Sequence, residues 1–149
     1  MPTAGRLAGA ALFAPLFWYL SQISAPYFIA AETAVPDWWA IINAGFGLIL
    51  GWKMCGGRAG KTGWIGGLGN GLTTGLVIAF VALFAHSFIE MVKLSLRKLY
   101  DGPADALIGI FDLLFDYAML LAQPDVILAL LVGSVIAGLV AEYFGKTFR

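Results

Sequence analysis

Long apolar stretches separated by short polar segments dominate the chain. A helix needs about 20 mostly apolar residues to cross the hydrocarbon core of a bilayer. Four stretches meet this need, at about residues 7–23, 38–55, 71–92 and 126–144. Their apolar residues run continuously instead of alternating, and in lipid only helices or closed barrels satisfy the backbone polar groups. The pattern predicts an all-α fold, an integral membrane four-helix bundle in a single membrane domain over 1–149.

Boundary residues refine this prediction. The second stretch opens with Trp38 and Trp39, whose rings suit the membrane–water interface, and Trp52 marks its other end. Pro15 lies inside the first stretch, and its missing backbone donor predicts a kink. The glycine-rich segment 56–71 is expected to be a flexible basic loop. Glu142, at the end of the last stretch, is expected to reach the interface.

A fifth helical segment at about residues 104–122 differs from the others. The helical pattern of the third stretch continues to Leu99, about 28 residues or roughly 42 Å, which exceeds the roughly 30 Å hydrocarbon core. That helix is therefore expected to project beyond the membrane. Asp101-Gly102-Pro103 then predicts a tight turn, since Gly suits a helix end and Pro the first turn of the next. We expect an amphipathic helix that forms a hairpin with the third span.

The polar face of this helix is acidic. Asp105, Asp112 and Asp116 have spacings of seven and four, which place them on one helical face. In the hairpin we expect ion pairs of Lys98 with Asp105 and of Lys93 with Asp112. Exposed pairs contribute only about 0–1 kcal/mol each, so apolar contact must supply most of the stability. The alternative is that the stripe binds a cation or a partner protein.

Composition agrees with a membrane protein. Hydrophobic residues make up 60% of the 149 positions and charged residues only 12%, where a soluble domain carries about 25% charged residues. The formal net charge is zero, so no nucleic-acid partner is expected. The apolar run that begins at Leu7 is longer than the roughly 7–15 residues of a signal-peptide core, which favours a retained anchor over a cleaved signal. Membrane lipids are the expected partners.

Lys and Arg placement predicts the orientation. With four spans, one side of the membrane receives Arg6, Lys53, Arg58, Lys61, Lys146 and Arg149. The other side receives Lys93, Arg97 and Lys98. The larger group predicts that both termini are cytoplasmic. The three basic residues on the other side favour the opposite orientation.

Small residues recur at four-residue spacing within the spans. Such spacing lets helix backbones approach closely in lipid. The residues are Gly47, Gly51, Gly67, Gly71, Gly75, Ser134 and Gly138. We expect them to pack helices within the bundle, and a dimerisation face that builds a homo-oligomer is the alternative.

His86 and Glu90 lie one helical turn apart near the end of the third span. We expect an interfacial polar pair, with His86 also approaching Asp116 across the hairpin. A proton relay or a pair of metal ligands is the alternative, although a metal site usually needs three or four ligands and the chain has one histidine. No metal, no cofactor and no catalytic residues are predicted, so the protein is expected not to be an enzyme.

The basic loop contains Gly60-Lys61-Thr62, which matches the end of a phosphate-binding P-loop. Cys55 stands where the first glycine of that motif belongs, and no strand precedes it, so nucleotide binding is not expected. Anionic lipid headgroups are a possible ligand of the loop. Met54 and Cys55 together offer two soft ligands, but one pair does not make a site and ordinary packing is expected.

Short motifs along most of the chain suggest a family. They are Pro2-Thr3-Ala4, Asn43-Ala44-Gly45 with Gly51-Trp52-Lys53, Gly67-Leu68-Gly69-Asn70-Gly71-Leu72-Thr73, and Ser95-Leu96-Arg97-Lys98-Leu99-Tyr100-Asp101-Gly102-Pro103. These motifs resemble the TrgA family of bacterial membrane proteins, named for tellurite resistance. The resemblance implies an alphaproteobacterial inner-membrane protein linked to tellurite tolerance. It implies no mechanism and no catalytic residues.

Three functions follow as hypotheses. The first is a non-enzymatic membrane protein associated with tellurite and oxidative-stress tolerance, on the strength of the resemblance. The second is a structural accessory subunit of a larger inner-membrane complex, suggested by the small size and the small-residue faces. The third is a small transporter component, which is the weakest because no pair of broken helices flanks a polar midplane site.

Overall fold

The computed structural model describes residues 3–148, and every regular element in that range is helical. The elements are α1 (Ala4–Ala30), α2 (Trp39–Leu50), η1 (Gly51–Cys55), α3 (Gly56–Arg58), α4 (Gly63–Leu96), α5 (Pro103–Leu121) and α6 (Pro124–Thr147). Four helices are long and apolar enough to cross a membrane, at Ala4–Ala30, Trp39–Arg58, Gly63–Leu96 and Pro124–Thr147. The predicted all-α membrane bundle is confirmed. Pro2 and Arg149, used above, lie outside the described residues.

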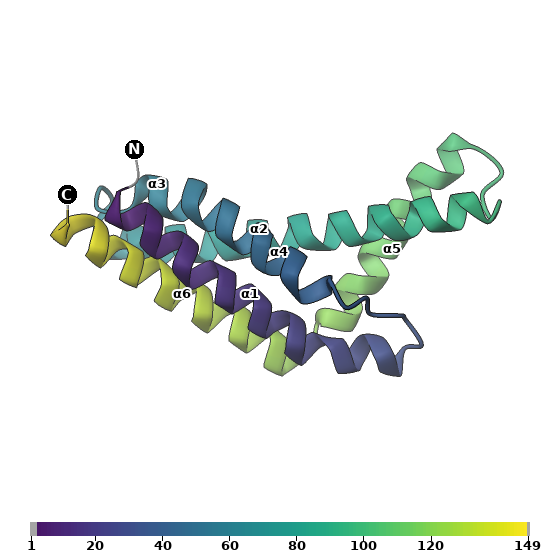
Figure 1. Ribbon diagram of the computed structural model, residues 1–149, viewed down its shortest axis with the longest axis horizontal. Helices are drawn as coiled ribbons and strands as arrows, with labels where there is room; N and C mark the ends of the chain where they lie inside the picture. The colour runs from purple at the N-terminus through teal and green to yellow at the C-terminus, as the bar shows by residue number, and fades with distance from the viewer. Residues whose placement is uncertain (1–2, 149) are drawn as a thin grey trace.

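The helices pack as an antiparallel bundle with one long arm (Figure 1). α1 contacts both α2 and α6, and α6 also contacts α4. The two ends of the chain lie at the same end of the bundle. At the other end α4 continues past the start of α6, and α5 runs back from the tip of α4 to α6.

Two helices are longer than the sequence suggests. α1 continues through Pro15 and Pro26 to Ala30, well beyond the predicted end at residue 23. α4 begins at Gly63, so residues 63–70 are helical and the predicted flexible loop is wrong for that part. Glycines disfavour helix in water, but here they let α4 lie directly against α6. With 34 residues, α4 is about 51 Å long.

The predicted small residues all lie at contacts between helices of this chain. On the α1–α2 side, Gly47 lies against Phe13 and Gly51 against Gly9. On the α4–α6 side, three glycines of α4 lie against the small residues of α6: these are Gly67, Gly71 and Gly75 against Ser134 and Gly138. These small residues therefore pack helices against one another within the bundle.

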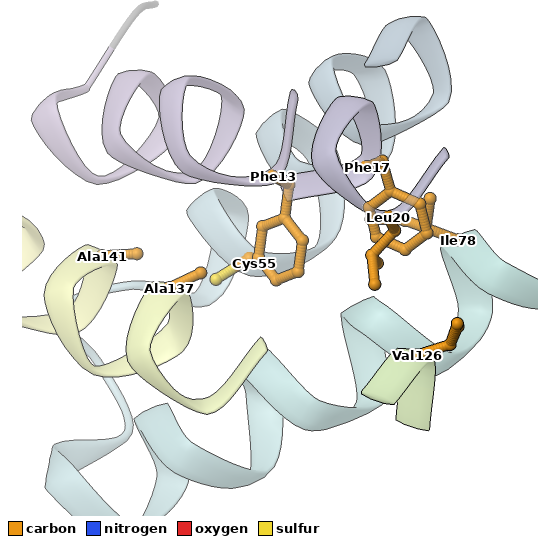
Figure 2. Close-up of a cluster of buried hydrophobic side chains, with 8 residues drawn as sticks. All are labelled: Phe13, Phe17, Leu20, Cys55, Ile78, Val126, Ala137 and Ala141. Carbon is orange, nitrogen blue, oxygen red and sulfur yellow. The ribbon is translucent and has the colours of Figure 1, made fainter. Parts of the chain in front are cut away.

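The apolar core lies where the four spanning segments meet. Figure 2 shows it as a row of side chains: Phe13, Phe17, Leu20, Cys55, Ile78, Val126, Ala137 and Ala141. Cys55 is fully buried in this row, so ordinary packing accounts for it. It lies at the end of η1, a short π-helical turn, and Asn70 of α4 donates a hydrogen bond to its carbonyl at 2.9 Å. Helix, not strand, therefore precedes the Gly60-Lys61-Thr62 segment.

α5 packs on α4, and its buried residues are Gly109, Ile110 and Tyr117. The ring of Tyr117 meets Phe28 of α1 edge-on, with centroids 5.3 Å apart. Burial raises the pKa of Tyr117 to about 12, and the nearby charges of Glu90 and Asp116 add to the shift. The outer surface of α5 carries an apolar sector formed by Leu107, Ile108, Phe111, Phe115 and Met119. Beside that sector lies an acidic one formed by Asp105, Asp112 and Asp116.

The hairpin is present, but its predicted ion pairs need correction. Lys93 pairs with Glu90 of its own helix at 3.0 Å instead of with Asp112. Among the described residues, no ion pair joins Lys98 to Asp105. The acids lie on the outer surface of α5, because apolar residues occupy the inner one. Lys98 lies in the turn itself, with a left-handed backbone (φ 58°).

Candidate functional site

His86 is held at a junction between α4 and α2. Its Nε2 lies 2.9 Å from Oδ1 of Asn43. Its ring stacks on Trp39, with centroids 3.9 Å apart and an interplanar angle of 27°. The predicted pair with Glu90 is wrong, because Glu90 turns to Lys93 while His86 is buried among the helices.

A chain of hydrogen bonds continues from His86 into α1. Asn43 Nδ2 donates to Ser21 Oγ at 2.9 Å, and Ser21 Oγ donates to the carbonyl of Phe17 at 2.7 Å. Ser24 Oγ donates to the carbonyl of Ser21 at 3.1 Å. The amide oxygen of Asn43 can only accept, so His86 Nε2 carries the proton and Nδ1 is left as an acceptor.

These polar groups form one wall of a cavity of about 270 Å³. α1, α2, α4, α5 and α6 all contribute to its lining. Apart from Ser21, Ser24, Asn43, His86 and the indole of Trp39, the lining is aliphatic or aromatic. A mostly apolar pocket with a few convergent polar groups is the usual form of a small-molecule site.

Among the described residues that line the cavity, Trp39 has a buried donor without a partner. Its ring is buried and lines the cavity, and its Nε1 has no hydrogen-bond partner. A buried donor without a partner costs about 1–3 kcal/mol of stability. A ligand that accepts a hydrogen bond from this donor would recover that free energy on binding. The sequence suggested only an interfacial role for this tryptophan.

The chemistry of the lining limits what can bind. None of the described residues that line the cavity is Lys, Arg, Asp or Glu. Transfer of a charge into such surroundings without a partner is strongly unfavourable. The cavity therefore suits a neutral molecule that offers hydrogen-bonding atoms at one edge.

Glu142 forms a second polar centre, at the end of the bundle that holds both termini. It is 1% exposed, so the expectation that it reaches the interface is wrong. Its carboxylate accepts hydrogen bonds from the backbone N–H groups of Gly60 and Gly63 at 2.7 and 2.8 Å, and Lys146 lies 3.7 Å away. The two backbone contacts fix the turn before α4 and its first residue, whereas Lys146 lies one turn along α6 from Glu142, so this centre is structural.

The polar residues within the predicted spans were a signal for the cavity, although residue spacing alone does not reveal it. Ser21 and Asn43 lie within predicted spans, and polar residues inside a membrane segment are costly unless they have partners or a function. They lie 22 residues apart in different helices. Only the antiparallel packing of α1 and α2 shows that they meet.

Comparison with protein-family models, with curated proteins and with solved structures found no match.

Proposed function

We propose that the protein is a non-enzymatic multi-pass membrane protein that supports tellurite and oxidative-stress tolerance by binding a neutral, membrane-soluble molecule beside His86. The observation that carries the binding role is the cavity itself, an apolar space inside the bundle with one polar wall and an unpaired indole N–H. The stress role draws its support from the motifs that resemble the TrgA family.

Tellurite itself is a poor candidate for the ligand. It is an oxyanion, and oxyanion sites rely on Arg, Lys or clustered backbone N–H donors. The side chains that line the cavity provide hydroxyl, amide, imidazole and indole groups among apolar ones. The proposed role in tolerance is therefore indirect, through a neutral molecule of the membrane.

The proposal includes a location in the bacterial inner membrane with both termini in the cytoplasm. Its support is the charge distribution at the end of the bundle where the termini lie. That end carries Arg6, Lys53, Arg58, Lys61 and Lys146. An excess of Lys and Arg favours the cytoplasmic side.

A complementation experiment tests the role of the cavity in tolerance. In a deletion strain, the wild-type chain should restore growth on tellurite, whereas Ala82→Leu should not, because Ala82 lines the cavity and a larger side chain would fill it. Ala11→Leu, at an exposed position of α1, is the matched control and should restore growth. Equal amounts of each variant in the membrane fraction must be verified.

Either of two results would overturn the proposal. The deletion strain could tolerate tellurite as well as its parent, which would remove the stress role. Alternatively, Ala82→Leu could complement as fully as Ala11→Leu, which would separate tolerance from the cavity.

A second candidate function, an accessory subunit of a larger membrane complex, is favoured by the tip of the α4–α5 hairpin. Leu96 is 81% exposed and Leu99 is 64% exposed there, beyond the packed part of the bundle. Purification from native membranes in mild detergent, followed by mass spectrometry, tests this candidate. A partner present in stoichiometric amount, and lost on Leu96→Ser, would support it.

A further inference from the structure

The volume of the cavity matches a single substituted ring. A cavity of about 150 Å³ lined by apolar side chains holds benzene. The cavity beside His86 is about 270 Å³, which leaves room for one six-membered ring and small substituents.

Hydrogen-bonding capacity defines the polar edge of that ring. Trp39 Nε1–H is a donor without a partner. His86 Nδ1 is an acceptor, because Nε2 is committed to Asn43. The two side chains are stacked with ring centroids 3.9 Å apart and both line the cavity, so this donor and this acceptor lie close together. A carbonyl oxygen would satisfy the first group, and a hydroxyl group would satisfy the second.

Aromatic surfaces line the same space. Phe17 of α1 and Trp39 of α2 both contribute to the lining, and flat rings stack favourably on such side chains. In Figure 2, Phe17 and Leu20 reach from α1 toward the side where Val126 lies, and all three line the cavity. Beyond these rings and the polar wall, the lining is aliphatic, which disfavours a strongly polar ring.

The cavity also borders the outside of the bundle near the corner between α5 and α6. Ala122 and Ile127 line it and are at the same time exposed, Ile127 by 41%. Ile127 lies on α6, one of the helices long and apolar enough to cross a membrane, and the apolar outer surface of such a helix faces lipid chains. A ring held beside His86 could therefore keep a long apolar tail in the membrane.

We infer that the cavity binds the ring of an isoprenoid quinone or quinol. Such a molecule is neutral, has a single flat ring, carries carbonyl or hydroxyl groups and bears a lipid tail. Trp39 Nε1–H donates to a ring oxygen, and in the reduced form a ring hydroxyl donates to His86 Nδ1. The inference rests on the proposed function, whose neutral ligand it identifies, and it concerns binding without turnover.

Indole N–H resonances provide a direct test. The full chain, labelled with ¹⁵N-tryptophan and reconstituted in nanodiscs, has five indole N–H groups, one for each tryptophan. Trp39→Phe assigns the signal of interest. Decylubiquinone should move the Trp39 signal downfield in a saturable manner and leave the signal of Trp64, at the opposite end of α4, in place. Decylbenzene, which has the tail and ring without oxygen, should not produce this shift.

Two variants supply quantitative expectations. Ala82→Leu should weaken decylubiquinone binding by at least about tenfold, because it occupies the space of the ring. Trp39→Phe should weaken it about three- to tenfold, the usual contribution of one hydrogen bond. The other indole signals show whether each variant keeps the native fold, and Ala11→Leu should bind like the wild type.

The inference fails if decylubiquinone leaves the Trp39 signal unchanged, or if decylbenzene moves it equally. It also fails if Ala82→Leu, with its other indole signals unchanged, binds decylubiquinone as tightly as the wild type does. A failure of this kind is distinct from a failure of the proposed function. If Ala82→Leu still abolished tellurite tolerance while decylubiquinone did not bind, the cavity would keep its role and its ligand would belong to another class.

Discussion

Glu142 of α6 and Gly63, the first residue of α4, are joined by a hydrogen bond of 2.8 Å from the backbone N–H to the carboxylate. The other carboxylate oxygen accepts the N–H of Gly60 at 2.7 Å. The first N–H groups of a helix have no partner within it, and negative charge is favourable there. Gly60 and Gly63 have φ of +81° and +74°, which glycine adopts without strain. One buried carboxylate therefore fixes the turn between two spans.

Removal of this carboxylate should destabilise the bundle. Glu142→Ala leaves the buried N–H of Gly60 and the partly buried N–H of Gly63 without acceptors, and we expect the free energy of unfolding to fall by about 2–3 kcal/mol. Glu142→Gln keeps an acceptor oxygen and should lose less. Titration with sodium dodecyl sulfate, followed by circular dichroism, measures both. Asp37→Asn, at an exposed loop position, is the control, and a Glu142→Ala variant as stable as that control would refute the assignment.

The contact between α4 and α6 should not tolerate an added methyl group. A Cβ at Gly71 would lie 2.6 Å from the Cα of Gly138, and backbone cannot yield as a flexible side chain can. Gly71→Ala should therefore lower the free energy of unfolding by about 1–3 kcal/mol.

Gly69 is the matched control on the same helix, because a Cβ there meets nothing within 4 Å. Gly69→Ala should leave stability unchanged or raise it by up to about 1 kcal/mol, since alanine favours helix over glycine. Equal effects of the two substitutions in the same detergent titration would contradict the proposed packing.

The hydrogen bond between Asn43 and His86 should appear as a coupling energy. A double-mutant cycle with Asn43→Ala and His86→Ala should give about 0.6–1.7 kcal/mol, the range found for hydrogen bonds between membrane helices. A cycle that pairs Asn43→Ala with Lys93→Ala, whose side chain bonds Glu90 instead, should give almost none. A coupling energy for His86 no larger than that of the control would show that the bond contributes nothing in the membrane.

The acidic sector of α5 should face water, and its apolar sector should face lipid. A cysteine at Asp112, in the acidic sector, should react with a membrane-impermeant maleimide about ten times faster than one at Phe115, in the apolar sector, because only exposed thiolates react readily. The wild-type chain gives the background, since Cys55 is buried. Equal labelling of both positions in intact vesicles would mean that α5 does not lie at the interface.

The apolar runs alone are enough to predict the four spans and the fifth helix, because the length of an apolar run and the turn at Asp101-Gly102-Pro103 are local properties. Helix ends were less predictable. The sequence of residues 63–70 is typical of a loop in water, but Gly67 in this segment lies against Gly138 and Glu142 of α6. The first span was expected to end at about residue 23, yet α1 continues through Pro26 to Ala30.

The site depends on contacts that sequence spacing does not encode. His86 and Glu90 are neighbours on one helical face, which favoured a local pair. Their actual partners are Asn43, 43 residues away in the chain, and Lys93, three residues away. Likewise, the charges of α5 follow a helical repeat, but that repeat cannot show which face of α5 packs against α4.

Native mass spectrometry of the protein extracted from its own membrane tests the central claim, that the cavity beside His86 holds a ligand, most directly. Wild type and Ala11→Leu should each carry one small neutral molecule that dissociates on collisional activation. Ala82→Leu, at equal purity, should be free of it. The same bound molecule in all three proteins, or in none, would contradict the account.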